Sequence, residues 1–225
     1  MIELKNIAKR YNDFYALKNI NLTVKQGEFF AIVGNSGSGK STLLNMIGLI
    51  DEPTEGEVLY HGRSITSFSD TQKAVFRNKT IGFVFQAFHL EPSYSVFKNT
   101  ELPLIIRGVD KRIRKKMVES ALESVGLLSK IKNKADTLSG GEKQRVAIAR
   151  ALIGDPEIIL ADEPCGNLDT KNSEAVMKIL SDINIGGKTV IMVTHNREHS
   201  AEIGRYIELA DGEIVHDERY SGGQL

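Results

Sequence analysis

The sequence predicts an α/β fold in which buried strands alternate with helices around a phosphate-binding loop. Three short apolar runs, at residues 29–33, 158–161 and 189–193, are typical of buried strands. The first run leads directly into the glycine-rich segment 34–42, and an apolar helical run follows that segment. Polar residues suited to ligand chemistry follow the other two runs. In open α/β sheets, ligands bind beyond the carboxyl ends of the strands.

The composition limits the class of protein. A chain of 225 residues suits one large domain or a core with an inserted lobe, and 41% hydrophobic and 26% charged residues are typical of a globular protein. The 29 basic and 29 acidic residues balance, so no basic surplus indicates a nucleic-acid partner. The single cysteine, Cys165, excludes an internal disulfide framework and suits a reducing cytosol. We expect neither a signal peptide nor a transmembrane segment.

The segment GNSGSGKST fits the pattern G-x-x-x-x-G-K-[ST] between a strand and a helix, which is the context that this motif requires. Its glycines let backbone amide groups close around phosphates. We expect Lys40 to reach the β- and γ-phosphates and Ser41 to bind Mg²⁺. A helix is predicted over 43–49, and half-buried strands over 2–11 and 19–25. The residues predicted to cradle the nucleotide are Gly34, Asn35, Ser36, Gly37, Ser38, Gly39, Lys40, Ser41 and Thr42.

Three predicted strands end in polar residues that could act on this nucleotide. Asp162 suits Mg²⁺, and because neighbouring residues of an extended chain point to opposite sides, Glu163 is expected to face the attacking water. Gln86, after the run 81–85, is either an ordinary solvated amide or a contact to Mg²⁺ or water. His195 has either a structural role or donates a hydrogen bond to the γ-phosphate. Together they indicate one site.

Two other sequence features, an aromatic residue and a short polar motif, each allow two interpretations. Tyr11 is either a core residue or a ring that stacks on adenine, and spacing alone does not decide between them. Residues 133–136, NKAD, spell the guanine-reading pattern N-K-x-D. No buried strand precedes them, so we interpret the match as coincidence in a polar connector.

The stretch Leu138–Leu152, LSGGEKQRVAIARAL, predicts a helix that begins after Ser139. Ser139 and Glu142 have the spacing of a capping box. Gly140 and Gly141 either leave amide groups open for an anion or merely form a turn into the helix.

In this order, the motifs of the chain resemble those of an ABC transporter ATP-binding subunit over essentially all 225 residues. The resemblance implies a P-loop NTPase fold, a single ABC ATPase domain. Residues 1–86 and 156–225 are expected to form a RecA-like core with a mixed sheet and an antiparallel β subdomain, and 87–155 an inserted helical subdomain that carries the signature. The motifs are Gly34–Ser41, Gln86, LSGGEKQR, Ile158–Glu163, GNLD and His195.

The resemblance also implies ATP hydrolysis. It assigns Glu163 as general base, His195 as switch residue, and Lys40 and Gln86 to the catalytic group. Tyr11 matches the residue that stacks on adenine. The Mg²⁺ region is implied at Ser41, Gln86 and Asp162, and GNLD at 166–169 contains the loop that faces a partner subunit.

The resemblance further implies a head-to-tail homodimer in which ATP is sandwiched between copies. Because residues 34–42 already hold the phosphates within one chain, Ser139, Gly140 and Gly141 are expected to cover the ATP of the other copy. The expected location is the cytoplasmic face of the cell membrane, beside a separately encoded integral membrane permease, with no nucleic acid involved.

A closer resemblance connects the chain to lipoprotein-release, macrolide-export and antimicrobial-peptide systems, and implies export or extraction of a peptide, lipoprotein or drug-like substrate. The alternative is a nucleotide-gated regulatory ATPase of a membrane complex that moves no solute. Glu142 departs from the glutamine more usual in the wider family, and Cys165 from threonine. The matching segments are FVFQAFHLEP at 83–92, NTELPL at 99–104 and DEPCGNLDT at 162–170.

Overall fold

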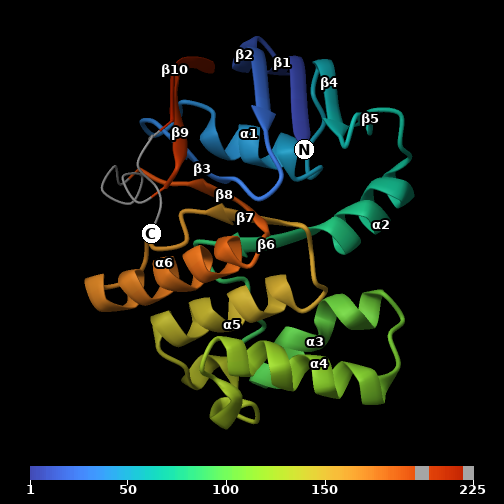
Figure 1. Cartoon of the computed structure of the whole chain (residues 1–225), viewed down its shortest axis with the longest axis vertical. Helices are drawn as coiled ribbons and strands as arrows, with labels where there is room; N and C mark the ends of the chain where they lie inside the picture. The colour runs from blue at the N-terminus through green and yellow to red at the C-terminus, as the bar shows by residue number, and fades with distance from the viewer. Residues whose placement is uncertain (196–202, 220–225) are drawn as a thin grey trace.

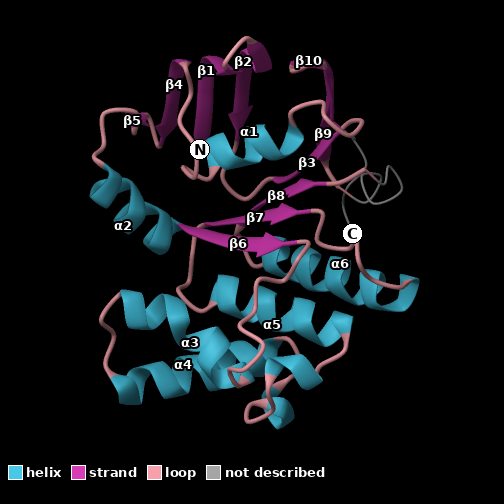
Figure 2. Cartoon of the chain, turned by 180° about the vertical axis from the view of Figure 1, so that it is seen from behind, coloured by secondary structure: helices cyan, strands magenta, loops and turns pink. Residues whose placement is uncertain are grey.

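The computed structural model describes residues 1–195 and 203–219, which form stacked layers. Figure 1 shows an antiparallel sheet at one end of the molecule, with helix α1 directly beneath it. A mainly parallel sheet forms the middle layer. Helices α6 and α5 cover its other face, and α3 and α4 form the opposite end (Figures 1 and 2).

The middle sheet has the order β10-β9-β3-β8-β7-β6 within the described residues. All its neighbouring pairs are parallel except β10 and β9. The carboxyl ends of β3, β8, β7 and β6 therefore lie at one edge of the sheet. Its strands are β3 (Phe29–Val33), β6 (Ile81–Phe85), β7 (Ile158–Asp162), β8 (Thr189–Val193), β9 (Arg205–Ala210) and β10 (Glu213–Arg219).

The second sheet is antiparallel, with the order β2-β1-β4-β5. Its first two strands form a hairpin in which Tyr11 pairs with Phe14 across a two-residue turn. The strands are β1 (Ile2–Tyr11), β2 (Phe14–Val24), β4 (Glu55–Tyr60) and β5 (Arg63–Ser64).

Most of the helices begin at a side chain that caps their first turn. Ser69, Ser95, Asp110, Ser139 and Asp169 each accept a hydrogen bond from a backbone N–H two or three residues ahead. The helix α1, which follows the glycine-rich loop, has no such cap. The helices are α1 (Lys40–Ile47), α2 (Asp70–Thr80), α3 (Val96–Ile106), α4 (Lys111–Ser124), α5 (Gly140–Leu152) and α6 (Thr170–Ile185), with 3₁₀ turns η1 (Leu128–Lys130) and η2 (Ala135–Thr137).

The parallel strands are buried on both faces, which explains their unbroken apolar sequences. Alternate residues of β7 pack into two different clusters. Ile158 and Leu160 join α1 and the antiparallel sheet, whereas Ile159 and Ala161 join the cluster of α3, α4, α5 and α6. One sheet thus separates two cores, and its carboxyl edge is held rigidly between them.

The structure confirms the predicted strands 29–33, 81–85 and 189–193, and it extends the run at 158–161 to Asp162. It corrects the helix after the glycine-rich loop, which begins at Lys40 and ends at Ile47, because the loop itself turns into the helix at Gly39. The predicted strand 19–25 is also wrong in its start, since β2 already begins at Phe14. In the parts of the chain that the structure describes, no helix is long and apolar enough to cross a membrane.

Candidate nucleotide site

The glycine-rich loop connects the carboxyl end of β3 to the first turn of α1. Gly39, at the N-cap of α1, adopts a left-handed conformation with φ 104°, and the first turn contains no acidic residue. Without a side-chain cap, the first N–H groups of α1 remain available, and the helix N-terminus favours an anion. At Gly34, any Cβ would lie 2.3 Å from the carbonyl oxygen of Leu209, so only glycine fits there. The loop is thus built to bring backbone amides toward a phosphate.

Two side chains of the loop are buried and ready for phosphate oxygens. The Nζ of Lys40 donates to the carbonyl oxygen of Asn35 at 2.8 Å, which folds this side chain back along the loop. The Oγ of Ser38 is buried and makes no hydrogen bond with any residue that the structure describes. A buried hydroxyl without a partner is costly, and a phosphate oxygen would supply one.

A cleft of about 510 Å³ opens beside the loop at the carboxyl edge of the parallel sheet. It brings together most of the residues that the sequence predicted for the site. It also contains two residues that the sequence reasoning missed, Phe14 and Ala16. The lining residues are Tyr11, Phe14, Ala16, Ser36, Gly37, Gly39, Lys40, Ser41, Thr42, Gln86, Glu163 and His195.

Ser41 and Asp162, two of the predicted Mg²⁺ ligands, lie next to each other. The Oγ of Ser41 donates to Oδ1 of Asp162 at 3.3 Å. Burial raises the pKa of Asp162, with a further contribution from Glu163, while Ser41 and Lys40 oppose the shift. A divalent cation would compensate this half-buried carboxylate, and hydroxyl and carboxylate oxygens are ligands that Mg²⁺ accepts. The residues therefore fit a magnesium ion.

Gln86, the third predicted Mg²⁺ ligand, lies in the same cleft and is attached to the GNLD segment. Its Nε2 donates to Oδ1 of Asn167 at 3.3 Å, and Nδ2 of Asn167 donates to the Gln86 carbonyl oxygen at 3.1 Å. Gln86 therefore contacts both the loop at 166–169 and the cleft.

Glu163 and His195 form a direct pair. The Nδ1 of His195 lies 2.6 Å from Oε2 of Glu163, and both residues line the cleft. Asp162 instead contacts Ser41, so the two neighbouring carboxylates have different partners. The expectation of an extended chain at this point is wrong, because Glu163 is left-handed, with φ 48°.

Tyr11 is 46% exposed, which rules out the interpretation as a core residue. Its hydroxyl donates to Oδ2 of Asp51 at 2.5 Å. This hydrogen bond, together with burial, raises the pKa of Tyr11 to about 12. Lys9 donates to the other carboxylate oxygen of Asp51 at 2.7 Å, and its Nζ lies 4.8 Å from the centre of the Tyr11 ring. The ring is thus held in place at the edge of the cleft.

The helix α5 begins with the predicted capping box. The Oε2 of Glu142 accepts from the Ser139 N–H at 3.0 Å, and the Ser139 Oγ accepts from the Glu142 N–H at 3.4 Å. The other carboxylate oxygen of Glu142 forms an ion pair with Lys130. This pair lowers the pKa of Glu142 and balances its charge. The structure thereby accounts for the departure from glutamine, through a partner that the sequence reasoning missed.

Gly140 and Gly141 do not line the cleft of their own chain. A Cβ at Gly141 would lie 2.0 Å from Oδ1 of Asn172, so a larger residue here would displace the Asn172 side chain between α5 and α6. The predicted contact with the nucleotide of another copy stays a prediction.

A guanidinium group connects α5 to the segment that follows Gln86. Arg150 donates to the carbonyl oxygen of Phe88 at 2.8 Å and also to that of His89. Both carbonyl residues have positive φ, 60° and 49°. Residues other than glycine rarely adopt this backbone conformation. The hydrogen bonds of Arg150 therefore stabilise an otherwise unfavourable loop.

Cys165, the second departure, is half-buried beside α6. Its Sγ donates to the Ser173 carbonyl oxygen at 3.8 Å, and burial raises its pKa to about 11. The thiol thus takes part in a hydrogen bond at this position.

Comparison with known proteins identifies the family of this chain. Residues 17–166 match the ABC transporter family. An uncharacterized ABC transporter ATP-binding protein of Methanocaldococcus jannaschii is 50% identical over 219 residues, which are 96% of this chain and 98% of the relative. The lipoprotein-releasing system ATP-binding protein LolD of Aquifex aeolicus is 44% identical over 96% of both chains.

Two further similarities concern fusion proteins and three-dimensional structure. The macrolide export ATP-binding/permease protein MacB of Chlorobaculum tepidum is 46% identical over the whole of this chain, which spans 35% of that relative. A solved dimeric structure, described as a post-hydrolysis state of the ATP-binding cassette MJ0796 bound to ADP and Pi, has a TM-score of 0.91 and 44% identity, and covers 99% of this chain and 100% of that chain. The solved ABC cassettes confirm the expected α/β fold with its P-loop and antiparallel subdomain. The chain therefore belongs to the ABC transporter family, as one of its ATP-binding subunits with ATPase activity.

Proposed function

We propose that two copies of this chain bind Mg²⁺-ATP head to tail and that ATP-driven closure of the dimer powers a separate membrane permease. The observation that carries the proposal is the division of the motifs within one chain. The phosphate loop, Glu163 and His195 share one cleft, whereas the signature residues Ser139, Gly140 and Gly141 stand outside it. A second copy, placed head to tail, would bring its signature to the open side of the nucleotide. The dimeric ATP-binding cassettes among the structural relatives support this arrangement.

The proposed chemistry follows from the contacts in the cleft. The amides of the loop and Lys40 bind the β- and γ-phosphates, and Tyr11 stacks on adenine. Ser41, Gln86 and Asp162 hold Mg²⁺, which supplies neutralisation of phosphate charge.

Glu163 is the proposed general base for the attacking water. Its carboxylate accepts the proton of the water while the water oxygen attacks the γ-phosphorus and the β–γ bridging bond breaks. His195 holds this carboxylate through Nδ1. In the proposed mechanism the other ring nitrogen, Nε2, contacts the γ-phosphate, so the histidine orients base and phosphate relative to each other.

A second groove supports the proposed permease contact. It has a volume of about 520 Å³ and is bordered by α2, β6, the segment after Gln86, the end of α3 and Arg150 of α5. Phe85, His89, Pro103 and Ile106 line it, and Ile106 is 76% exposed. Such exposure suits a protein partner. A permease segment seated here would sense both the Gln86 segment and α5.

We further infer that the subunit acts at the cytoplasmic face of the cell membrane in a system that exports or extracts a peptide, lipoprotein or drug-like substrate. The names of the relatives support this substrate class, since they include a lipoprotein-releasing system and a macrolide exporter. The relatives named above are ATP-binding proteins of transporters, and the comparisons do not favour the alternative of a regulatory ATPase that moves no solute.

Replacement of the proposed base tests the mechanism. Glu163→Gln should keep ATP binding, lower turnover by about 10²–10⁴-fold and trap an ATP-dependent dimer in size-exclusion chromatography. Turnover at the unmodified rate would contradict the assignment of the base.

A second variant tests the composite site. Ser139→Arg should leave ATP binding by the isolated chain intact, because Ser139 does not line its own cleft. It should abolish both dimer formation and hydrolysis. Normal hydrolysis by a monomeric Ser139→Arg variant would refute the head-to-tail arrangement.

A further inference from the structure

We propose that Phe14 and Tyr11 together form a two-ring platform for the base of the nucleotide, so that Phe14 is a second determinant of nucleotide affinity. This inference rests on the proposed function, since the base belongs to the ATP held by the phosphate loop. Neither the motifs of the sequence nor the comparisons assign a role to Phe14.

The hairpin register places the Tyr11 and Phe14 side chains on the same face of the hairpin. Tyr11 and Phe14 are direct cross-strand partners at the end of the β1–β2 hairpin. Cross-strand partners project from the same face of a sheet with their Cβ atoms about 5 Å apart. Both residues line the cleft of the phosphate loop, and so does Ala16 at the register shift of the hairpin.

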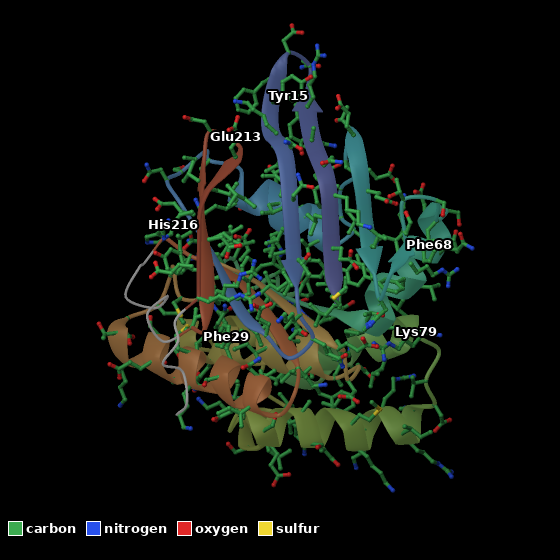
Figure 3. All side chains as sticks on the ribbon, turned by 45° about the horizontal axis from the view of Figure 1, so that its top comes forward. Tyr15, Phe29, Phe68, Lys79, Glu213 and His216 are labelled. Atoms are coloured by element: carbon green, nitrogen blue, oxygen red, sulfur yellow. The ribbon has the colours of Figure 1, made fainter. Side chains whose placement is uncertain are left out.

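The neighbouring cross-strand pair faces the other way and supplies an internal comparison. Arg10 and Tyr15 are partners in the same register, and the Arg10 guanidinium lies 5.6 Å from the centre of the Tyr15 ring. Neither residue lines the cleft. Figure 3 labels Tyr15 near the free end of this hairpin. The hairpin end thus presents one aromatic face to the cleft and a second aromatic face away from it.

The two rings form the apolar end of an otherwise polar cleft. Phe14 is 64% exposed and Tyr11 is 46% exposed. The charged and hydroxyl residues among the cleft lining, such as Lys40, Ser41 and Glu163, belong to the phosphate loop and the strand ends. An aromatic side chain exposed to this degree gains most by covering an apolar ligand face, and a nucleotide base has such a face.

Hydrogen bonds hold the turn of the hairpin and the Tyr11 ring in place. The Arg10 guanidinium donates to the Asn12 carbonyl oxygen at 2.5 Å and to Oδ1 of Asp13 at 3.1 Å, which holds the turn. The Tyr11 hydroxyl is held by Asp51. Rigid anchors lose little conformational entropy on binding. Tyr11 is therefore the ordered half of the platform, and Phe14 extends it on a turn of fixed geometry.

Binding experiments separate the base from the phosphates. Stacking of a base on an aromatic side chain typically contributes about 5- to 100-fold in affinity. Because Phe14 is one of two rings, we expect Phe14→Ala to weaken ATP binding by about 5- to 10-fold. Binding of inorganic tripolyphosphate should be unchanged, since it has no base. Phe14→Tyr should retain ATP affinity, whereas Phe14→Leu, which keeps an apolar side chain, should not. Tyr15→Ala is the matched control for the fold of the hairpin and should bind ATP normally.

Fluorescence provides an independent measurement, because the chain contains no tryptophan. Phe14→Trp introduces a single indole into the platform, and ATP should quench its emission while tripolyphosphate should not. Tyr15→Trp, on the opposite face, should show no change with either ligand.

The possible outcomes are distinct. ATP affinity of Phe14→Ala equal to that of the unmodified chain, or an indole at position 14 that does not respond to ATP, would overturn the platform while ATP binding and hydrolysis of the unmodified chain remained. Failure of the unmodified chain to bind ATP at all would instead contradict the proposed function.

Discussion

Removal of Lys130 tests whether the charge of Glu142 is balanced by one specific partner. In the structure, the side chain of Glu142 is 17% exposed and that of Lys130 is 40% exposed. Among the described residues, Lys130→Met would leave Glu142 with Ser139 as its partner, and the long side chain of methionine would keep the packing. Because a partly exposed ion pair is screened by solvent, we expect a loss of about 0.5–1 kcal/mol in the free energy of unfolding.

The sign of the pH dependence follows from the pKa of Glu142, which Lys130 lowers below its ordinary value of 4.5. The stabilisation is therefore complete above about pH 4.5 and is lost as the pH falls through the lowered pKa. Urea unfolding should distinguish Lys130→Met from the unmodified chain at pH 7, and the difference should shrink as the pH falls below about 4.5.

A double-mutant cycle measures the pair directly. Glu142→Gln preserves the capping box, since glutamine also serves at this position. In this background, Lys130→Met should leave the free energy of unfolding unchanged. The coupling energy should therefore equal the full loss of about 0.5–1 kcal/mol. ATP-dependent dimerisation of Lys130→Met should weaken at low salt and recover in the double variant or at high salt. A coupling energy below about 0.3 kcal/mol would refute the reasoning.

Three further outcomes follow from buried groups. Arg205→Met should lower the free energy of unfolding by about 1.5–3 kcal/mol in urea titrations. The 6% exposed guanidinium side chain binds both carboxylate oxygens of Asp217, and its loss leaves these hydrogen bonds unmade, while solvent screens the 43% exposed carboxylate; a loss under about 0.5 kcal/mol would contradict this. Tyr60→Phe should cost about 1–2 kcal/mol, since the buried Ile47 carbonyl loses its donor, and an unchanged urea midpoint would contradict that role. With a pKa of about 11, Cys165 should react slowly with iodoacetamide at pH 8 and much faster in urea, and equal rates would contradict its burial.

The sequence predicted the central sheet well because buried parallel strands leave an unmistakable pattern. The strand β3 and the loop to α1 are local features, in which an apolar run, glycines and a lysine follow one another directly. The strand-end residues Glu163 and His195 could be assigned to one site because the ends of neighbouring parallel strands meet at one edge.

The features that the sequence did not reveal depend on contacts between distant or differently folded segments. Lys130 and Glu142 meet only because η1 packs beside the start of α5. The start of β2 was missed because Phe14 and Tyr15 immediately follow a two-residue turn, so the strand begins before its apolar alternation becomes visible. For the same reason Phe14 was not predicted as a cleft residue. Its spacing of three residues from Tyr11 is the spacing that a two-residue hairpin turn requires.

Arg150 connects the helix that carries the signature with the segment that follows Gln86. Its hydrogen bonds fix the backbone of Phe88 and His89, directly after Gln86, from the helix whose first turn carries the signature. A displacement of α5 that broke these bonds would release the two left-handed residues to relax, which makes the shape of the segment conditional on the position of the helix. In a head-to-tail pair, the occupancy of one ATP site and the readiness of the other to hydrolyse would then vary together, and hydrolysis would rise with ATP concentration more steeply than a single independent site allows.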